Sequence, residues 1–388
     1  MVNAESGGAQ LLKRNKSNTD ATAPGFVTSL FYQRLPPKML EIERISENSQ
    51  IVSKNSLLNI SDKKRQFSLT KSSNDMDRSS AKFDVLIIGG GPAGMAAALW
   101  CADLGLSAII LEKKPEFGGQ LLRTYAPITN YPGRRTADGR EMRDNFAGGL
   151  AEIDVVTRMS ANVIGLDTNE LGIDLDDGSN ILGNSIIIAT GIRRRRLGVE
   201  GEREFAGRGL LESGVASKEL VDGKRVVIVG GGDAAFENAV ILADRAGSVT
   251  LLHRSASFTA RDEFVTQVRE NPKINVIENV KLSKITGDDA VRAVEYVDII
   301  SGDVRMLAAD AVLVRIGVEP NTGILPDAIK LDEFGYVVTD KMCMTSVQFV
   351  FAIGDVANRL APTISGAAGD AATAAKAAYR LLRASKKL

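Results

Sequence analysis

The chain of 388 residues has only two cysteines, one histidine and one tryptophan. Its cysteines, Cys101 and Cys343, stand too far apart for the spacing of a disulfide framework or of a metal-ligand motif. It also lacks a net charge, because 48 basic residues balance 48 acidic ones, so no global field attracts nucleic acid or an anionic membrane. We therefore expect neither nucleic acid nor a membrane among its partners, and no bound metal.

Long apolar runs are missing as well. No run reaches the ~18 residues that a bilayer span needs, and the N-terminus lacks the apolar core of a secretory signal, so we expect a cytoplasmic protein. The chain is nevertheless 44% hydrophobic and 25% charged, as ordinary globular proteins are. Its length predicts about two folded domains with an additional segment.

Residues 1–80 supply that additional segment. They are rich in Ser, Asn, Lys and Asp and show no sustained period, which predicts a mostly disordered N-terminal extension. A short helix or a docking segment within residues 26–45 is the alternative.

A βαβ unit begins at Phe83, where an apolar strand, a glycine turn, an Ala-rich helix and a second apolar strand follow one another. Gly89, Gly91 and Gly94 form a GxGxxG pattern, in which glycines allow the tight turn, the approach of a pyrophosphate and close helix packing. Glu112 ends the second strand and is placed to bind ribose hydroxyls. A glycine turn without a ligand is the alternative, but the complete strand, turn, helix and acid favour a dinucleotide.

The same arrangement returns after Lys224, with Gly230, Gly232 and Ala235 as GxGxxA. Glu112 stands 23 residues after Gly89, and His253 stands 23 residues after Gly230. His253 and Arg254 thus replace the ribose-binding acid by groups that suit a 2′-phosphate, which indicates NADPH rather than NADH, although NADH remains possible. A structural imidazole is the alternative for His253. This pairing indicates that FAD binds at the first turn and NADPH at the second. Hydride transfer between the two cofactors is the reaction that follows.

Several further strand ends carry candidate flavin contacts. They are Gly118–Gln120, Ala189–Gly191, and Gly354 with Asp355.

The sequence from Phe83 onward resembles the low-molecular-weight thioredoxin reductases, within the pyridine nucleotide-disulfide oxidoreductase superfamily. The resemblance rests on GGGPAG at 89–94, FGGQL at 117–121, TNYPG at 129–133, ATG at 189–191, GVEPNT at 317–322 and AIGDV at 352–356. It implies an α/β fold with two Rossmann-like domains, of which the NADPH domain is inserted in the FAD domain. The implied boundaries are 81–195 and 317–388 for the FAD domain and 196–316 for the NAD(P)H domain, and the implied assembly is a homodimer.

The resemblance also implies two sets of site residues. The FAD set is Gly89, Gly91, Pro92, Ala93, Gly94, Glu112, Lys113, Gly119, Gln120, Leu121, Asn130, Thr190, Gly191, Gly354, Asp355, Thr363 and Ile364. The NADP set is Gly230, Gly232, Asp233, Ala234, Ala235, His253, Arg254, Arg261, Ile316 and Gly317. The family's 2′-phosphate clamp reads HRRxxxR. Here Arg254 is kept, the next position is Ser255, and the last arginine falls on Thr259, two residues before Arg261.

The chain departs from the family at the redox centre. The two cysteines of the CxxC motif fall on Ser213 and Ala216, and the acid that follows falls on Ser217. These residues supply neither a disulfide nor a thiolate, so we assign no catalytic residue. We expect Cys101 to be buried and inert. Cys343 is expected to be more exposed but without a redox role, because only Lys341 adjoins it as a base.

These observations predict an FAD-dependent NAD(P)H oxidoreductase that passes electrons to an external acceptor, a small protein or a small molecule, without an in-chain disulfide. The first alternative is a thioredoxin-reductase-like ferredoxin or flavodoxin NADP reductase. A bacillithiol disulfide reductase is less favoured, because Ala93 stands where that subtype has cysteine. A flavin- and NADPH-binding redox sensor without turnover is the alternative from another class.

Overall fold

A computed structural model describes residues 82–386 of the chain. The predicted extension over residues 1–80, including the segment 26–45, lies outside the described residues.

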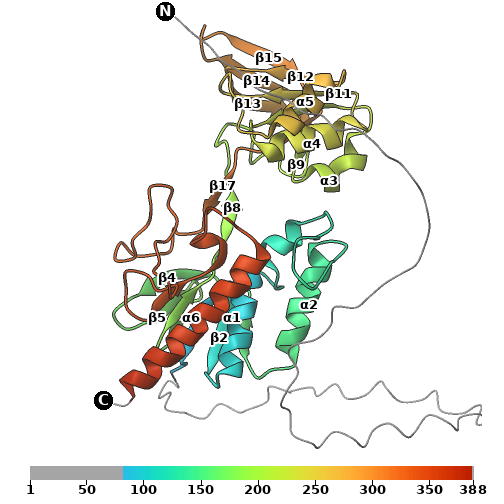
Figure 1. The fold of residues 1–388 in the computed structure, drawn as a ribbon. Helices are drawn as coiled ribbons and strands as arrows, with labels where there is room; N and C mark the ends of the chain where they lie inside the picture. The colour runs from blue at the N-terminus through green and yellow to red at the C-terminus, as the bar shows by residue number, and fades with distance from the viewer. Residues whose placement is uncertain (1–81, 387–388) are drawn as a thin grey trace, which may run out of the picture. The chain divides into compact units, whose positions relative to one another are not determined.

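The first parallel sheet, which contains the strand labelled β2 in Figure 1, has the order β18-β7-β1-β2-β3. Its strands are β1 (Val85–Ile88), β2 (Ala108–Glu112), β3 (Val156–Met159), β7 (Ile186–Ile188) and β18 (Val350–Ala352). Strands β1, β2, β7 and β18 are buried throughout, because layers cover both faces of the sheet. This burial explains why they read in the sequence as continuous apolar runs.

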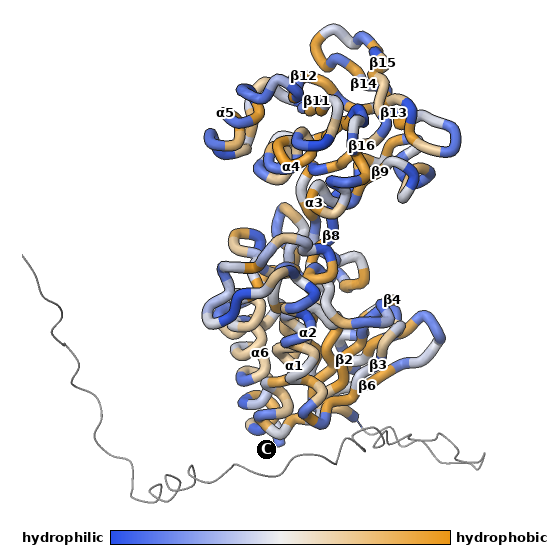
Figure 2. Tube along the Cα trace, turned by 90° about the vertical axis from the view of Figure 1, so that its right-hand side faces the viewer, coloured by the Kyte–Doolittle hydropathy of each residue, from blue (hydrophilic) through white to orange (hydrophobic). Residues whose placement is uncertain are grey.

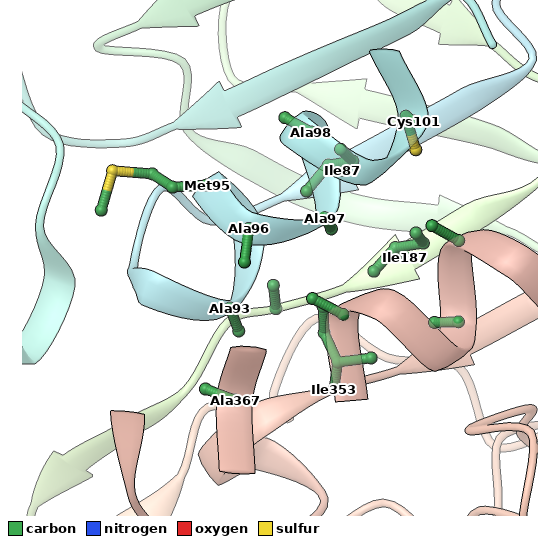
Figure 3. Close-up of a cluster of buried hydrophobic side chains, with 14 of the residues drawn as sticks. Ile87, Ala93, Met95, Ala96, Ala97, Ala98, Cys101, Ile187, Ile353 and Ala367 are labelled. Atoms are coloured by element: carbon green, nitrogen blue, oxygen red, sulfur yellow. The ribbon is translucent and has the colours of Figure 1, made fainter. Parts of the chain in front are cut away.

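One face of this sheet carries helices. Helix α1 (Pro92–Asp103) packs along α6 (Ile364–Ser385), with α2 (Gly139–Ala151) beside α1. Alanines on α1 and α6 allow the helices to approach each other closely, and Figure 3 shows Ala93 of α1 facing Ala367 of α6. The opposite face packs on an antiparallel sheet of β4 (Val163–Asp167), β5 (Gly172–Leu175) and β6 (Asn180–Leu182).

The second parallel sheet repeats this plan with the order β12-β11-β10-β16-β9. Its strands are β9 (Leu210–Leu211), β10 (Arg225–Val229), β11 (Ser248–Leu252), β12 (Ile274–Ile277) and β16 (Ala311–Val314). Its associated helices are α3 (Gly214–Ser217), α4 (Asp233–Ala243) and α5 (Asp262–Glu270), and an antiparallel sheet of β13 (Val280–Gly287), β14 (Val291–Asp298) and β15 (Val304–Ala308) packs against it. In Figure 2 the hydrophobic residues follow the strands and the hydrophilic ones follow the connecting loops.

Two extended segments connect these sheets. Strand β8 (Ile192–Arg194) leaves the first sheet after β7, and β17 (Val318–Pro320) returns to it before β18, and the two strands pair with each other antiparallel. Short 3-10 turns complete the described elements: η1 (Gly119–Arg123), η2 (Lys218–Val221) and η3 (Gly354–Val356).

The predicted fold class, two Rossmann-like domains with one inserted in the other, is confirmed. The exact boundaries stay predictions. No helix among residues 82–386 combines the length and the apolar character needed to cross a bilayer.

Candidate flavin and nucleotide sites

The first glycine turn joins β1 to α1, and its glycines differ in their surroundings. Gly89 has a φ of +106°, and a Cβ there would collide with the carbonyl oxygen of Ala189. A Cβ on Gly94 would likewise collide with the carbonyl oxygen of Gly89. At Gly91 the nearest atom to such a Cβ is Gly119 Cα, 3.9 Å away. The protein therefore excludes side chains at Gly89 and Gly94, whereas Gly91 has open space beside it.

That space is part of a cavity of about 420 Å³ at the carboxyl ends of the first parallel sheet. It is lined by all the residues of the predicted FAD set except Gly94 and Gly354. Gly94 packs against the turn instead, and the amide of Gly354 donates to Asp370 Oδ2 at 3.1 Å. Residues predicted from distant motifs thus line one cavity, and their roles as flavin contacts stay predictions.

Glu112 closes the turn at the end of β2. Its carboxylate is buried and accepts hydrogen bonds from the amide of Gly90 at 2.6 Å and from the amide of Lys114 at 2.9 Å. Each oxygen retains a further lone pair. The backbone therefore holds the acid in a fixed position at the edge of the cavity, where a ribose hydroxyl can donate to it.

Asn321 also lines the cavity, although the site predictions did not include it. Its side-chain amide donates to the Thr190 carbonyl at 2.8 Å, and the Thr190 hydroxyl donates to the Asn321 carbonyl at 2.9 Å. These bonds join the ATG segment to the EPNT segment. The GVEPNT motif at 317–322, which contains Asn321, is the sequence signal for this residue.

Asp355 faces the same cavity next to a second carboxyl group. Burial raises the pKa of Asp355, and the nearby charge of Asp370 raises it further. Burial also raises the pKa of Asp370. A hydrogen-bond donor from a ligand in the cavity would therefore stabilise the Asp355 carboxylate.

The second glycine turn joins β10 to α4. Gly230 has a φ of +152°, and a Cβ there would collide with the Arg315 carbonyl oxygen. A Cβ on Gly231 would collide with the ring of His253, so the imidazole lies against the turn. Its Nε2 lies 2.9 Å from Ser255 Oγ and 3.0 Å from the Ser257 carbonyl. Local contacts therefore hold the imidazole at the predicted ribose position, and its role as a cofactor contact stays a prediction.

The two predicted phosphate-binding arginines differ in their partners. Arg261 Nε donates to Asp233 Oδ2 at 2.9 Å, so its charge is already paired. Arg254 is exposed, and among residues 82–386 no carboxylate lies within ion-pair distance of it. The rest of the predicted NADP set lies at the same edge: Gly232, Asp233, Ala234 and Ala235 at the start of α4, and Ile316 and Gly317 after β16.

The positions of the family's redox centre form a helix cap. Ser213 is buried, and its hydroxyl accepts from the amide of Ala216 at 3.5 Å at the start of α3. Ser217 is buried at the end of this helix. These three residues serve local structure and carry no thiol.

Both cysteines are buried elsewhere, in the core that joins α1 to α6. Cys101 is buried as predicted, and burial raises its pKa to about 12. Cys343 is the more exposed of the two, at 9% against 0% for Cys101, but it too is buried. A φ of +61° places this residue in a turn whose side chain enters the core, with Sγ 3.7 Å from the Asp370 carbonyl, and burial raises its pKa to about 12. Neither residue supplies a thiolate near neutral pH.

Comparison with known proteins places these features in a family. Residues 83–378 match the model of the family described as pyridine nucleotide-disulphide oxidoreductase. The chain is 36% identical over 304 residues to the thioredoxin reductase of Treponema pallidum, covering 76% of this chain and 96% of that protein. It is 33% identical over 301 residues to an NADH dehydrogenase of Ferdinandcohnia aciditolerans, covering 77% of this chain but only 57% of that protein's length.

Among solved structures, the thioredoxin reductase of Lactococcus lactis, in a form described as the FR conformation, matches with a TM-score of 0.68 and 33% identity, over 77% of this chain and 98% of that one. The motifs, the paired sheets and these matches agree. The chain belongs to the pyridine nucleotide-disulphide oxidoreductase family and is an FAD-dependent oxidoreductase.

Proposed function

We propose that this protein transfers hydride from NADPH, bound at the second glycine turn, to FAD in the first cavity, and then passes electrons to an acceptor outside the chain. The observation that carries the proposal is the pair of equivalent turns with opposite charge at the equivalent ribose position. Glu112 occupies this position in the first unit, and His253 with Arg254 occupies it in the second. An acid there suits ribose hydroxyls and a base suits a 2′-phosphate.

The residues of the first cavity fit FAD. The N-terminus of α1 presents backbone amides beside the open space at Gly91, which suits a diphosphate. Glu112 is held where it can accept a hydrogen bond from a ribose hydroxyl. Asp355 lines the same cavity and follows Gly354 after β18. Bound flavin and nicotinamide supply the hydride chemistry, while the protein binds and orients them.

The second turn fits a nucleotide with a 2′-phosphate through Arg254. Its guanidinium has no carboxylate partner among the described residues, whereas the charge of Arg261 is paired with Asp233. We therefore assign the selectivity for NADPH over NADH to Arg254.

The acceptor is external because the chain offers no disulfide relay. Ser213 and Ala216 replace the CxxC cysteines, and Cys101 and Cys343 are buried with raised pKa values. A small protein or a small molecule that approaches the flavin directly is the acceptor we infer. We further propose a cytoplasmic homodimer, on the basis of the family resemblance.

Anaerobic reduction of the purified yellow protein tests the proposal. NADPH should bleach the visible flavin absorption, and ferricyanide should restore it through many cycles. A colourless protein that FAD cannot reconstitute would contradict the flavin assignment. A flavin that NADPH reduces but that no acceptor reoxidises repeatedly would favour a redox sensor over an enzyme.

A further inference from the structure

Two arginines meet at the carboxyl edge of the second parallel sheet. Arg315 directly follows β16, and Glu212 directly follows the neighbouring strand β9. Arg315 Nη2 donates to the Glu212 carbonyl at 2.7 Å, and Nη1 donates to the Val314 carbonyl at 2.8 Å. Arg194, at the end of β8, donates through Nη1 to the same Glu212 carbonyl. One carbonyl oxygen thus holds two guanidinium groups together.

The charges of this pair are poorly compensated. Among residues 82–386, neither arginine has a carboxylate within 4.0 Å, although the Glu212 carboxylate partly offsets Arg194 from farther away. Burial and the charge of Arg194 lower the pKa of Arg315 to about 10. Burial and the charge of Arg123 lower the pKa of Arg194. Partly buried like charges that share one acceptor are unfavourable without an anion, so the pair has the character of an anion site.

The position of the pair relative to the glycine turn indicates which anion. The amide of Arg315 donates to the carbonyl of Val229, the last residue of β10, at 2.7 Å. The Arg315 carbonyl lies against Gly230, the first glycine of the turn. The backbone of Arg315 therefore adjoins the turn that a nucleotide diphosphate would approach.

Strand order gives the direction of the nucleotide. Strand β10 lies between β11, which ends before His253 and Arg254, and β16, which ends before Arg315. A dinucleotide lies along the carboxyl edge of such a sheet. If the 2′-phosphate binds to the residues that follow β11, the nicotinamide half of the dinucleotide extends over β16 and toward β9. The two arginines lie there.

We propose that Arg315 and Arg194 bind the nicotinamide-side phosphate of the dinucleotide. This inference rests on the proposed function, because it takes the second turn as the NADPH site. In this arrangement Arg254 binds the 2′-phosphate of the adenosine half, and the Arg315–Arg194 pair binds the phosphate of the nicotinamide half.

Two nucleotide fragments separate these contributions. 2′-Phospho-ADP-ribose carries the 2′-phosphate and both phosphates of the diphosphate, whereas 2′,5′-ADP carries only the 2′- and 5′-phosphates of the adenosine side, and neither contains nicotinamide. Binding of each to the flavin-loaded full chain would be measured by calorimetry for the wild type, Arg315→Gln and Arg194→Gln. We expect the wild type to bind 2′-phospho-ADP-ribose more tightly. Each substitution should weaken that binding about ten- to hundredfold and leave 2′,5′-ADP unchanged, as loss of a charge-assisted contact predicts.

Controls distinguish the possible failures. Arg254→Ala should weaken both fragments equally, and Arg292→Gln, on the exposed surface of β14, should weaken neither. An equal loss of both fragments in Arg315→Gln would mean that the arginine only supports the loop at Glu212, and would overturn the proposal. Unchanged binding in both arginine variants would overturn it as well.

Two further outcomes concern the ligand itself. Arg315-dependent binding of inorganic phosphate as tight as that of 2′-phospho-ADP-ribose would indicate a free-anion site instead of a nucleotide contact. If the wild type binds neither fragment, the NADPH site itself is wrong, and the inference falls with it.

Discussion

Substitution of Gly91 by glutamate tests the flavin cavity without disturbing the protein around it. Gly91 is the N-cap of α1 with a φ of −76°, which other residues adopt readily. A Cβ there meets only Gly119 Cα at 3.9 Å, an ordinary contact. The new side chain should therefore leave the apoprotein folded and extend into the cavity.

The size of the effect follows from charge. A carboxylate about 4 Å from a phosphate is repelled by about 1 kcal/mol in water and by about 4 kcal/mol at an effective dielectric constant of 20. A diphosphate presents two such groups, so Gly91→Glu should weaken FAD binding by at least about 2 kcal/mol, or about 30-fold. Steric displacement of the diphosphate adds to this loss.

The assay is the FAD content of the purified protein, followed by fluorescence titration of the apoprotein with FAD. Gly148→Glu is the matched control, because Gly148 is an exposed position on α2 with no atom within 4 Å of an added Cβ. It adds the same charge and should keep wild-type FAD content. A folded Gly91→Glu protein with wild-type FAD content and affinity would refute the placement of the diphosphate at this turn.

Three further predictions concern the second site, the thiols and a surface ion pair. Arg254→Ala should raise KM for NADPH about ten- to hundredfold and leave KM for NADH nearly unchanged; steady-state kinetics with both donors checks this, and an equal rise would remove Arg254 from the 2′-phosphate. Because burial raises the pKa values of Cys101 and Cys343 to about 12, a disulfide reagent should label neither in the native protein at pH 8 and both after denaturation; rapid labelling of the native protein would contradict their burial. Hydrogen bonds from Arg225 lower the pKa of Asp310 to about 2, so the pair stabilises the fold above pH ~4 and loses this effect as the pH falls toward 2. Asp310→Asn should lower the free energy of unfolding by about 1 kcal/mol or less at pH 7, with a difference that shrinks in acid, as urea unfolding would measure; a pH-independent difference would contradict this cause.

The sequence predicted those features that depend on local patterns. The continuous apolar runs of β1 and β2 predict a βαβ unit, because a GxGxxG turn and an Ala-rich helix lie between them. The equivalent positions of Glu112 and His253 were also predictable, since both follow from the length of one strand–helix–strand repeat. Most of the predicted flavin residues belong to such local motifs, and they line one cavity.

Features that depend on tertiary contacts were not predictable in this way. Cys343 is more exposed than Cys101, as expected, but its burial was not predictable, because it depends on a turn with positive φ that packs against the core. The pairing of Arg261 with Asp233 joins the start of α4 to the loop before α5, and no local pattern signals it. The meeting of Arg194 with Arg315 requires β8, β9 and β16 to end close together, which only the assembled chain shows.

The most direct test compares two acceptors for electrons from NADPH, ferricyanide and thioredoxin, with the wild type and a Cys101→Ala/Cys343→Ala double mutant. Flavin reduction requires only the two nucleotide sites, whereas reduction of thioredoxin by the family's disulfide route requires thiols that Ser213 and Ala216 do not supply. We predict sustained ferricyanide reduction by both proteins and no reduction of thioredoxin by either. NADPH-dependent reduction of thioredoxin by the wild type that persists in the double mutant would contradict the conclusion that the loss of CxxC closes the disulfide route.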